Sequence, residues 1–132
     1  MTQTLIHNRE HMRQIKDFSG LRFGKISPTD IDGFLDFGDK LFVFVEMKYG
    51  NAEIPLGQRI ALTRLCDAVV SKDRKSYLLI VRHELSSESD INVSEQIISD
   101  VYFNKRWHKA KNGWTLRDAI NWLLETHNLK GN

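Results

Sequence analysis

Two unbroken apolar runs dominate the hydrophobic pattern of the chain, at residues 41–45 and 77–81. Both are rich in β-branched and aromatic side chains, which is typical of strands covered on both faces. They predict core strands over 41–48 and 75–85. Shorter apolar runs between turn residues predict three further strands, over 21–26, 29–37 and 95–103.

Helical spacing, with apolar residues every three or four positions, marks three other segments: 5–18, 55–71 and 115–127. Pro55 is a favoured residue for the first turn of a helix. Thr115 and Asp118 have the spacing of a capping box. The predicted order is helix, three strands, helix, two strands and helix, so we expect an α/β domain with a mixed central sheet flanked by helices.

Composition is that of an ordinary globular domain. A chain of 132 residues with 41% hydrophobic content can fill one core but not two, so residues 1–132 are expected to form a single domain. The first residues lack the basic flank and apolar stretch of a leader peptide, and no segment approaches membrane-spanning length. We therefore expect a soluble, cytoplasmic protein without membrane contact, in which the lone Cys66 is a reduced structural thiol.

The net charge of +2 does not by itself indicate a nucleic-acid partner, but the charges are unevenly distributed. Residues 105–111 contain four basic side chains, a tryptophan and no acidic residue, whereas 86–90 is acidic. The basic segment is either a solvated loop or a surface for phosphate contact and base stacking. The candidate nucleic-acid-binding residues are Lys105, Arg106, Trp107, Lys109 and Lys111.

Candidate chemistry is concentrated where the strand at 41–48 ends. Period-two geometry places Glu46 and Lys48 on one side of that strand, and Asp30 and Asp32 on one side of the strand before it. A buried carboxylate is costly without compensation, so such a cluster usually holds a cation. Mg²⁺ needs only one or two carboxylates and a substrate oxygen, and a nearby lysine can orient water or offset negative charge. The pattern indicates a metal-dependent phosphodiesterase site.

Strand register decides which aspartate faces Glu46. A three-residue turn after Phe37 places Asp32 opposite Glu46, whereas a pairing that starts one residue earlier on each strand places Asp30 there. A two-residue turn turns both aspartates to the other face unless a bulge intervenes. The site therefore requires the longer turn or a bulge, and we choose Asp32 over Asp30.

These residues resemble the PD-(D/E)XK nuclease superfamily. Ile31-Asp32, a hairpin and then Val45-Glu46-Met47-Lys48 match its motif, and its core order of helix, three strands, helix and strand matches the prediction over residues 5–85. The resemblance implies a restriction-endonuclease-like αβββαβ core, to which this chain would add a C-terminal strand and helix.

The resemblance also implies roles for individual residues. Asp32 and Glu46 would bind the divalent metal, with the carbonyl of Met47 assisting. Lys48 would be the catalytic lysine, and Gln58, at the head of the next helix, would orient the lysine or a phosphate. Two further ligand candidates are Asp30 and, in the first helix, Glu10.

The expected function is a Mg²⁺-dependent nuclease, with Mn²⁺ able to substitute, that hydrolyses DNA phosphodiester bonds. A small domain without a separate recognition module favours structure-selective cleavage, as in Holliday-junction resolvases, over sequence-specific cleavage. A homodimer would place two sites across a two-fold axis. The alternative is a non-catalytic module that keeps the nuclease fold, binds nucleic acid or a protein, and has no metal at Asp32 and Glu46.

Other site patterns fit less well. Residues 7–11 match the H-x-x-E-H pattern of some zinc proteases, with Glu125 as the nearest downstream acidic ligand, but two solvated histidines on a surface helix explain them better. The glycines are too scattered for a phosphate-binding loop, so no nucleotide cofactor is expected.

Overall fold

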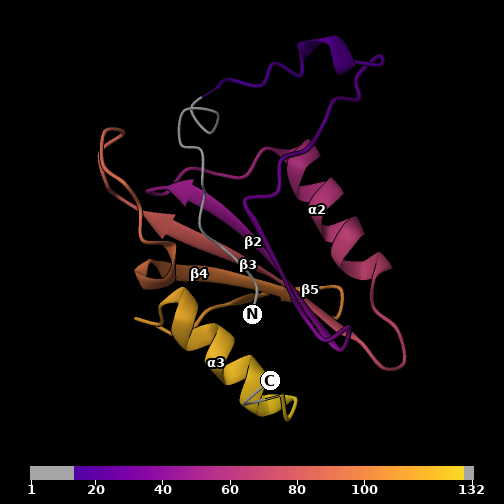
Figure 1. Cartoon of the computed structure of the whole chain (residues 1–132), viewed down its shortest axis with the longest axis vertical. Helices are drawn as coiled ribbons and strands as arrows, with labels where there is room; N and C mark the ends of the chain where they lie inside the picture. Colours follow the sequence, from indigo (N-terminus) through magenta and orange to yellow (C-terminus); the bar gives the residue numbers. More distant parts are fainter. Residues whose placement is uncertain (1–13, 130–132) are drawn as a thin grey trace.

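A five-stranded mixed sheet forms the centre of the computed structural model, which describes residues 14–129 (Figure 1). The strands lie in chain order across the sheet, and the second and third are parallel while all other neighbours are antiparallel. The predicted α/β class with a mixed sheet is thus confirmed. The strands are β1 (Gly33–Phe37), β2 (Leu41–Tyr49), β3 (Lys75–His83), β4 (Ile97–Phe103) and β5 (Arg106–Lys109).

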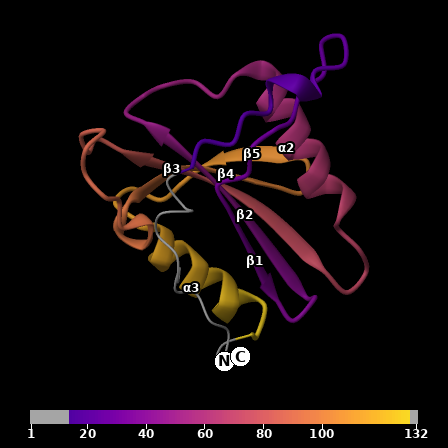
Figure 2. The ribbon, with the colours of Figure 1, turned by 45° about the horizontal axis from the view of Figure 1, so that its top comes forward.

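Two α-helices cover opposite faces of this sheet (Figure 2). Helix α2 (Leu56–Ala68) connects β2 to β3, which makes those two strands parallel. Helix α3 (Leu116–Thr126) follows β5 and begins with the predicted Thr115 capping box. Two short 3₁₀ turns, η1 (Ser19–Leu21) and η2 (Val93–Glu95), complete the described elements. Neither α2 nor α3, the α-helices of residues 14–129, is long and apolar enough to cross a membrane.

Strand β2 divides its side chains between the two faces. Leu41, Val43 and Val45 pack with α3, while Phe44 packs with α2. Because successive side chains alternate, Glu46 and Lys48 share the α2 face with Phe44. Strand β2 is buried on both faces, as the unbroken apolar run predicted. Its last residues therefore place two charged side chains beneath α2.

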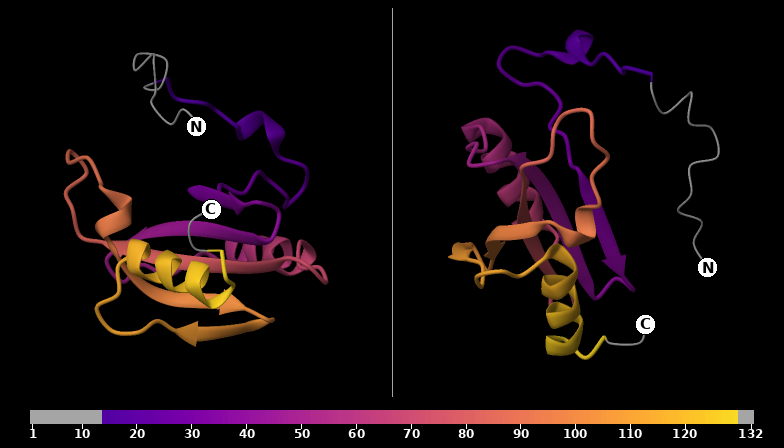
Figure 3. Two further views of the ribbon diagram at one scale, coloured as in Figure 1. Left: turned by 60° about the horizontal axis from the view of Figure 1, so that its bottom comes forward. Right: turned by 90° about the vertical axis from the view of Figure 1, so that its left-hand side faces the viewer.

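The N-terminal part departs from the predicted elements. Residues 1–13, which include most of the predicted first helix, lie outside the described residues, and 14–18 are not helical. The strand predicted at 21–26 is also wrong. Phe23 and Ile26 only close a turn on each other, with Gly24 at a φ of 65° that favours glycine. Figure 3 shows this segment running outside the sheet, where residues 14–32 are all exposed, so no packed face holds it as a strand.

Strand β1 is shorter than predicted, because it begins at Gly33 and not at residue 29. The carboxylate of Asp32 accepts the N–H of Met47 at 2.7 Å, so a side chain takes the place of the next backbone partner. The sheet ladder between β1 and β2 ends at that point.

Strand β5 was not predicted. Its residues are mostly basic, and the pattern indicated a loop or a binding surface. In the structure Asn104 and Lys105 form a two-residue turn, both with positive φ (52° and 62°), which pairs Phe103 with Arg106. Positive φ at both central positions is the feature of a type I′ hairpin turn.

Candidate functional site

Three side chains predicted for the site are in direct contact between β2 and α2. The Nζ of Lys48 lies 3.1 Å from Oε2 of Glu46 and donates to Oε1 of Gln58 at 3.0 Å. The amide nitrogen of Gln58 donates to the same Glu46 oxygen at 2.8 Å. Gln58 is on the first turn of α2, which crosses above the end of β2. The three residues therefore form a closed triangle of polar contacts, here called the Glu46 cluster.

Asp32 reaches this cluster through the strand register. Phe37 pairs with Leu41 across a three-residue turn, which confirms the register that the site requires. Gly33 pairs with Val45, so Asp32, one residue earlier, lies at the level of Glu46. Its hydrogen bond to the N–H of Met47 holds its carboxylate beside β2.

Glu46 is the electrostatic centre of the site. Its side chain is only 3% exposed, and this burial raises the pKa of its carboxyl. The negative charge of Asp32 raises that pKa further, while Lys48 opposes both effects. One of its oxygens, Oε1, is buried and has no hydrogen-bond partner among residues 14–129.

An unpartnered buried carboxylate oxygen has a free-energy cost that a cation or a proton would remove. The donors here are carboxylate oxygens, which Mg²⁺ prefers, and one or two carboxylates suffice because this ion keeps several waters. No group of three or more histidine, cysteine, aspartate or glutamate ligands occurs in the described part of the chain. The pair Asp32 and Glu46 therefore fits a Mg²⁺ ion that is completed by water and substrate.

Asp30 lies on the side of the cluster that faces α2, away from the buried carboxylate of Glu46. It lines a cleft of about 630 Å³ that also receives Lys48 and Gln58, between residues 25–30 and α2. Glu10 and the H-x-x-E-H pattern at residues 7–11 lie outside the described residues.

Two of the predicted DNA-binding residues face the same side of the sheet as the Glu46 cluster. Trp107 and Lys109 pair with Tyr102 and Asp100, and Tyr102 packs in the core under α2. Lys109 also forms an ion pair with Asp100, with Nζ and Oδ1 3.0 Å apart. Trp107 is therefore the more available contact of the two.

The other three lie elsewhere. Lys105 is in the turn before β5, and Arg106 pairs with Phe103, whose ring packs on the α3 side. The ammonium of Lys111 stands over the ring of Trp114, 5.5 Å from its centroid. The basic segment thus divides over two faces of the sheet, because alternate residues of a strand point in opposite directions.

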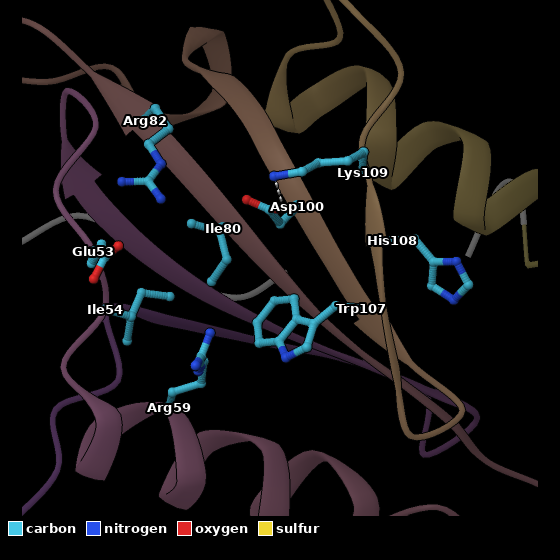
Figure 4. A pocket seen from close by; sticks show the side chains of 9 residues that line it. All are labelled: Glu53, Ile54, Arg59, Ile80, Arg82, Asp100, Trp107, His108 and Lys109. Atoms are coloured by element: carbon cyan, nitrogen blue, oxygen red, sulfur yellow. Dashed lines mark ion pairs between the residues drawn. The ribbon is translucent and has the colours of Figure 1, made fainter.

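The sequence pattern did not predict a pocket of about 420 Å³ that lies beside the Glu46 cluster (Figure 4). It brings Arg59 of α2 and Arg82 of β3 together with Trp107 of β5. These residues are far apart in the chain, and no spacing rule connects them. Arg59 directly follows Gln58, and this adjacency was the one signal available.

Comparison with known proteins gives no family for this chain. No protein-family model, curated protein or solved structure matches it. Any assignment to a family therefore rests on the residues of the site and on the order of the elements around them.

Replacing Gln58 by alanine is expected to reduce the affinity of the site for Mn²⁺ roughly 10- to 100-fold, the size typical when a residue that orients metal ligands is lost. The substitution removes a hydrogen bond from Glu46 and one from Lys48. Titration with Mn²⁺ measures the effect. Thr63→Ala is the matched control, because Thr63 is on the same helix and bonds only to backbone carbonyls. Equal loss in both variants would contradict a role for Gln58 in the site.

Proposed function

We propose that this protein is a Mg²⁺-dependent nuclease that hydrolyses DNA phosphodiester bonds. The observation that carries the proposal is Oε1 of Glu46, which is buried and has no hydrogen-bond partner among residues 14–129, in a carboxylate that interacts with Asp32 and with the ammonium of Lys48. A carboxylate pair with an adjacent lysine supplies cation ligands and a positive charge for phosphate in one place.

The order of the elements supports a relationship to the PD-(D/E)XK nucleases. A hairpin of β1 and β2, a crossover helix α2 and a parallel β3 follow one another as in that core. The agreement extends only to these elements, because the strand expected at 21–26 is not formed. We propose that β1, β2, α2 and β3 correspond to the later part of a restriction-endonuclease-like core.

Asp32 and Glu46 would hold the Mg²⁺ ion. When bound, the ion polarises the phosphodiester and lowers the pKa of its water. Lys48 lines the cleft of about 630 Å³, where its ammonium can orient the attacking water or offset the negative charge that develops on the phosphate. Gln58 accepts a hydrogen bond from this ammonium and so limits its positions.

The cleft itself favours an anionic substrate. Lys25, Lys48 and Arg64 line it, against the single carboxylate of Asp30. Positive charge along a cleft attracts a phosphate backbone without reading sequence. Cleavage that depends on DNA structure more than on sequence follows from this kind of contact.

A panel of single-stranded, duplex and branched DNA, incubated with Mg²⁺ or Mn²⁺, tests the proposal. We expect cleavage of at least one substrate, its loss with a chelator, and Mn²⁺ binding that disappears in Asp32→Ala. If the purified protein cuts none of them, the nuclease proposal fails. Salt-sensitive DNA binding without metal binding would identify the non-catalytic module instead.

A further inference from the structure

The pocket of about 420 Å³ begins one strand away from the Glu46 cluster. Glu46 on β2 pairs with Ile80 on β3, and Ile80 pairs with Asp100 on β4. Neighbouring strands are about 4.8 Å apart, so Ile80, which lies in the floor of the pocket, separates it from the buried carboxylate by a single strand spacing. A ligand in the pocket would therefore lie next to a group held at the cluster.

The lining of the pocket combines a flat ring with an apolar floor. Trp107 from β5 and Arg59 from α2 reach into the same space, and the aliphatic side chains of Ile54 and Ile80 line it beside them (Figure 4). The ring of Trp107 is held by Tyr102, with centroids 5.1 Å apart, yet the residue remains 37% exposed. An exposed, supported indole face beside aliphatic side chains is a stacking surface for another planar ring.

Most charged side chains of the pocket already have hydrogen-bond or ion-pair partners. Lys109 is paired with Asp100, and the guanidinium of Arg82 donates to Ser99 and to backbone carbonyls of the loop before α2. Arg59 has no ion pair within residues 14–129, and Figure 4 shows none between it and the other lining residues. Arg59 directly follows Gln58 on α2, so this lining residue of the pocket is the chain neighbour of a member of the Glu46 cluster.

The lining also offers acceptors for the edge of a base. Its two carboxylates, Glu53 and Asp100, stand among the cations of the pocket, and carboxylate oxygens accept hydrogen bonds from amino groups such as those on the edges of bases. Arg59, in contrast, suits the phosphate that joins such a base to the next nucleotide.

Resting on the proposed nuclease function, we propose that this pocket binds one unpaired nucleobase of the substrate strand, stacked on Trp107, with Arg59 on the adjoining phosphate. A base inside a duplex is stacked on both faces and paired along its edge, so it cannot enter such a pocket. The substrate class is therefore DNA with an unpaired nucleotide beside the cleaved bond, such as a single strand, a flap or a branch.

Trp107→Ala is expected to weaken the binding of single-stranded DNA roughly 5- to 150-fold, the range for loss of one base–aromatic stack. Binding is measured by fluorescence anisotropy in the presence of a chelator, and cleavage separately with Mg²⁺. Trp107→Phe should retain most of the affinity, because the stacking face remains. Trp122→Ala is the matched control, since Trp122 is a 49% exposed tryptophan on α3, on the other face of the sheet.

A set of oligonucleotides, each lacking the base at one position, locates the pocket on the substrate. Wild type should lose affinity when one particular base is absent, and Trp107→Ala should lose nothing more at that position. Arg59→Ala should weaken binding of the intact and the base-lacking strands alike.

The outcomes separate this inference from the nuclease proposal. Cleavage of DNA with equal preference for duplex and single strands, unaffected by Trp107→Ala, would overturn the pocket assignment and leave the nuclease standing. Binding that depends on Trp107 and on one base, without metal-dependent cleavage, would support the pocket and refute the nuclease. Absence of both DNA binding and cleavage would overturn both.

Discussion

Lys48→Met is expected to reduce the rate of Mg²⁺-dependent cleavage about 100- to 1,000-fold, the range for loss of one group that stabilises charge in the transition state. Methionine keeps most of the aliphatic length of lysine and removes the charge. The substitution takes the ammonium away from both Glu46 and Gln58. Single-turnover cleavage measures the effect, and circular dichroism checks that the fold is kept.

A pH profile separates two reasons for this loss. Lys48 lowers the pKa of Glu46, so its removal raises that pKa further. If Lys48 served only to keep Glu46 ionised, a higher pH would restore the rate of Lys48→Met. We expect no such recovery, because the ammonium is proposed to act on water or phosphate. Lys72→Met, at an exposed lysine in the connection between α2 and β3, is the control and should cleave like wild type.

Glu46→Gln is expected to abolish Mn²⁺ binding at this site and cleavage with it, while stabilising the metal-free protein at neutral pH by about 1 kcal/mol, the size of one net hydrogen bond, because the amide keeps an acceptor for Lys48 and Gln58 and removes the buried charge. The carboxylate is buried and its Oε1 has no partner in the described part of the chain, so its ionised form is costly until a cation binds. Isothermal titration measures the metal, and urea unfolding measures stability.

The stability difference should depend on pH in a defined direction. The pKa of Glu46 is raised in the folded protein, so the folded state binds the proton more tightly than the unfolded state. The stability that this carboxyl contributes is present below its ordinary pKa and is lost as the pH rises through the raised value. Glu46→Gln should therefore gain on wild type as the pH rises through that window.

The affinity of wild type for Mn²⁺ should rise over the same pH window, because a proton competes with the ion. Glu88→Gln, in the exposed loop before η2, is the control and should show neither trend. A wild type that is more stable than Glu46→Gln at neutral pH without metal would contradict the account of the site.

The sheet shows where sequence reasoning succeeded. The apolar runs at 41–45 and 77–81 predicted β2 and β3, because a strand covered on both faces needs apolar residues throughout. Glu46 and Lys48 were identified as unusual because they are charged and directly follow the first apolar run. The pairing of Phe37 with Leu41 was one of two registers that could bring an aspartate to Glu46. From the sequence we chose Asp32, the aspartate that goes with this pairing, and the structure confirms the register.

Other elements followed from contacts that no local pattern contains. Residues 21–26 resemble a strand in composition, but a strand needs a neighbouring strand and a packed face. Within residues 14–129 this segment is exposed and bridges only to itself, Phe23 to Ile26. Strand β5 is the opposite case, because its composition does not predict a strand. Its residues are mostly basic and exposed, and they form a strand because they pair with β4.

The sequence by itself determined the mixed α/β class, the two central strands, and Glu46 and Lys48 as a candidate site, since burial and alternation are properties of short segments; Gln58 was added by the resemblance to the nuclease superfamily. Only the tertiary structure decided that the register brings the chosen Asp32 to Glu46, that one Glu46 oxygen has no partner among residues 14–129, and that Arg59 and Trp107 meet in a pocket beside them. These features arise from strand register and from α2 crossing the sheet, which join residues far apart in the chain.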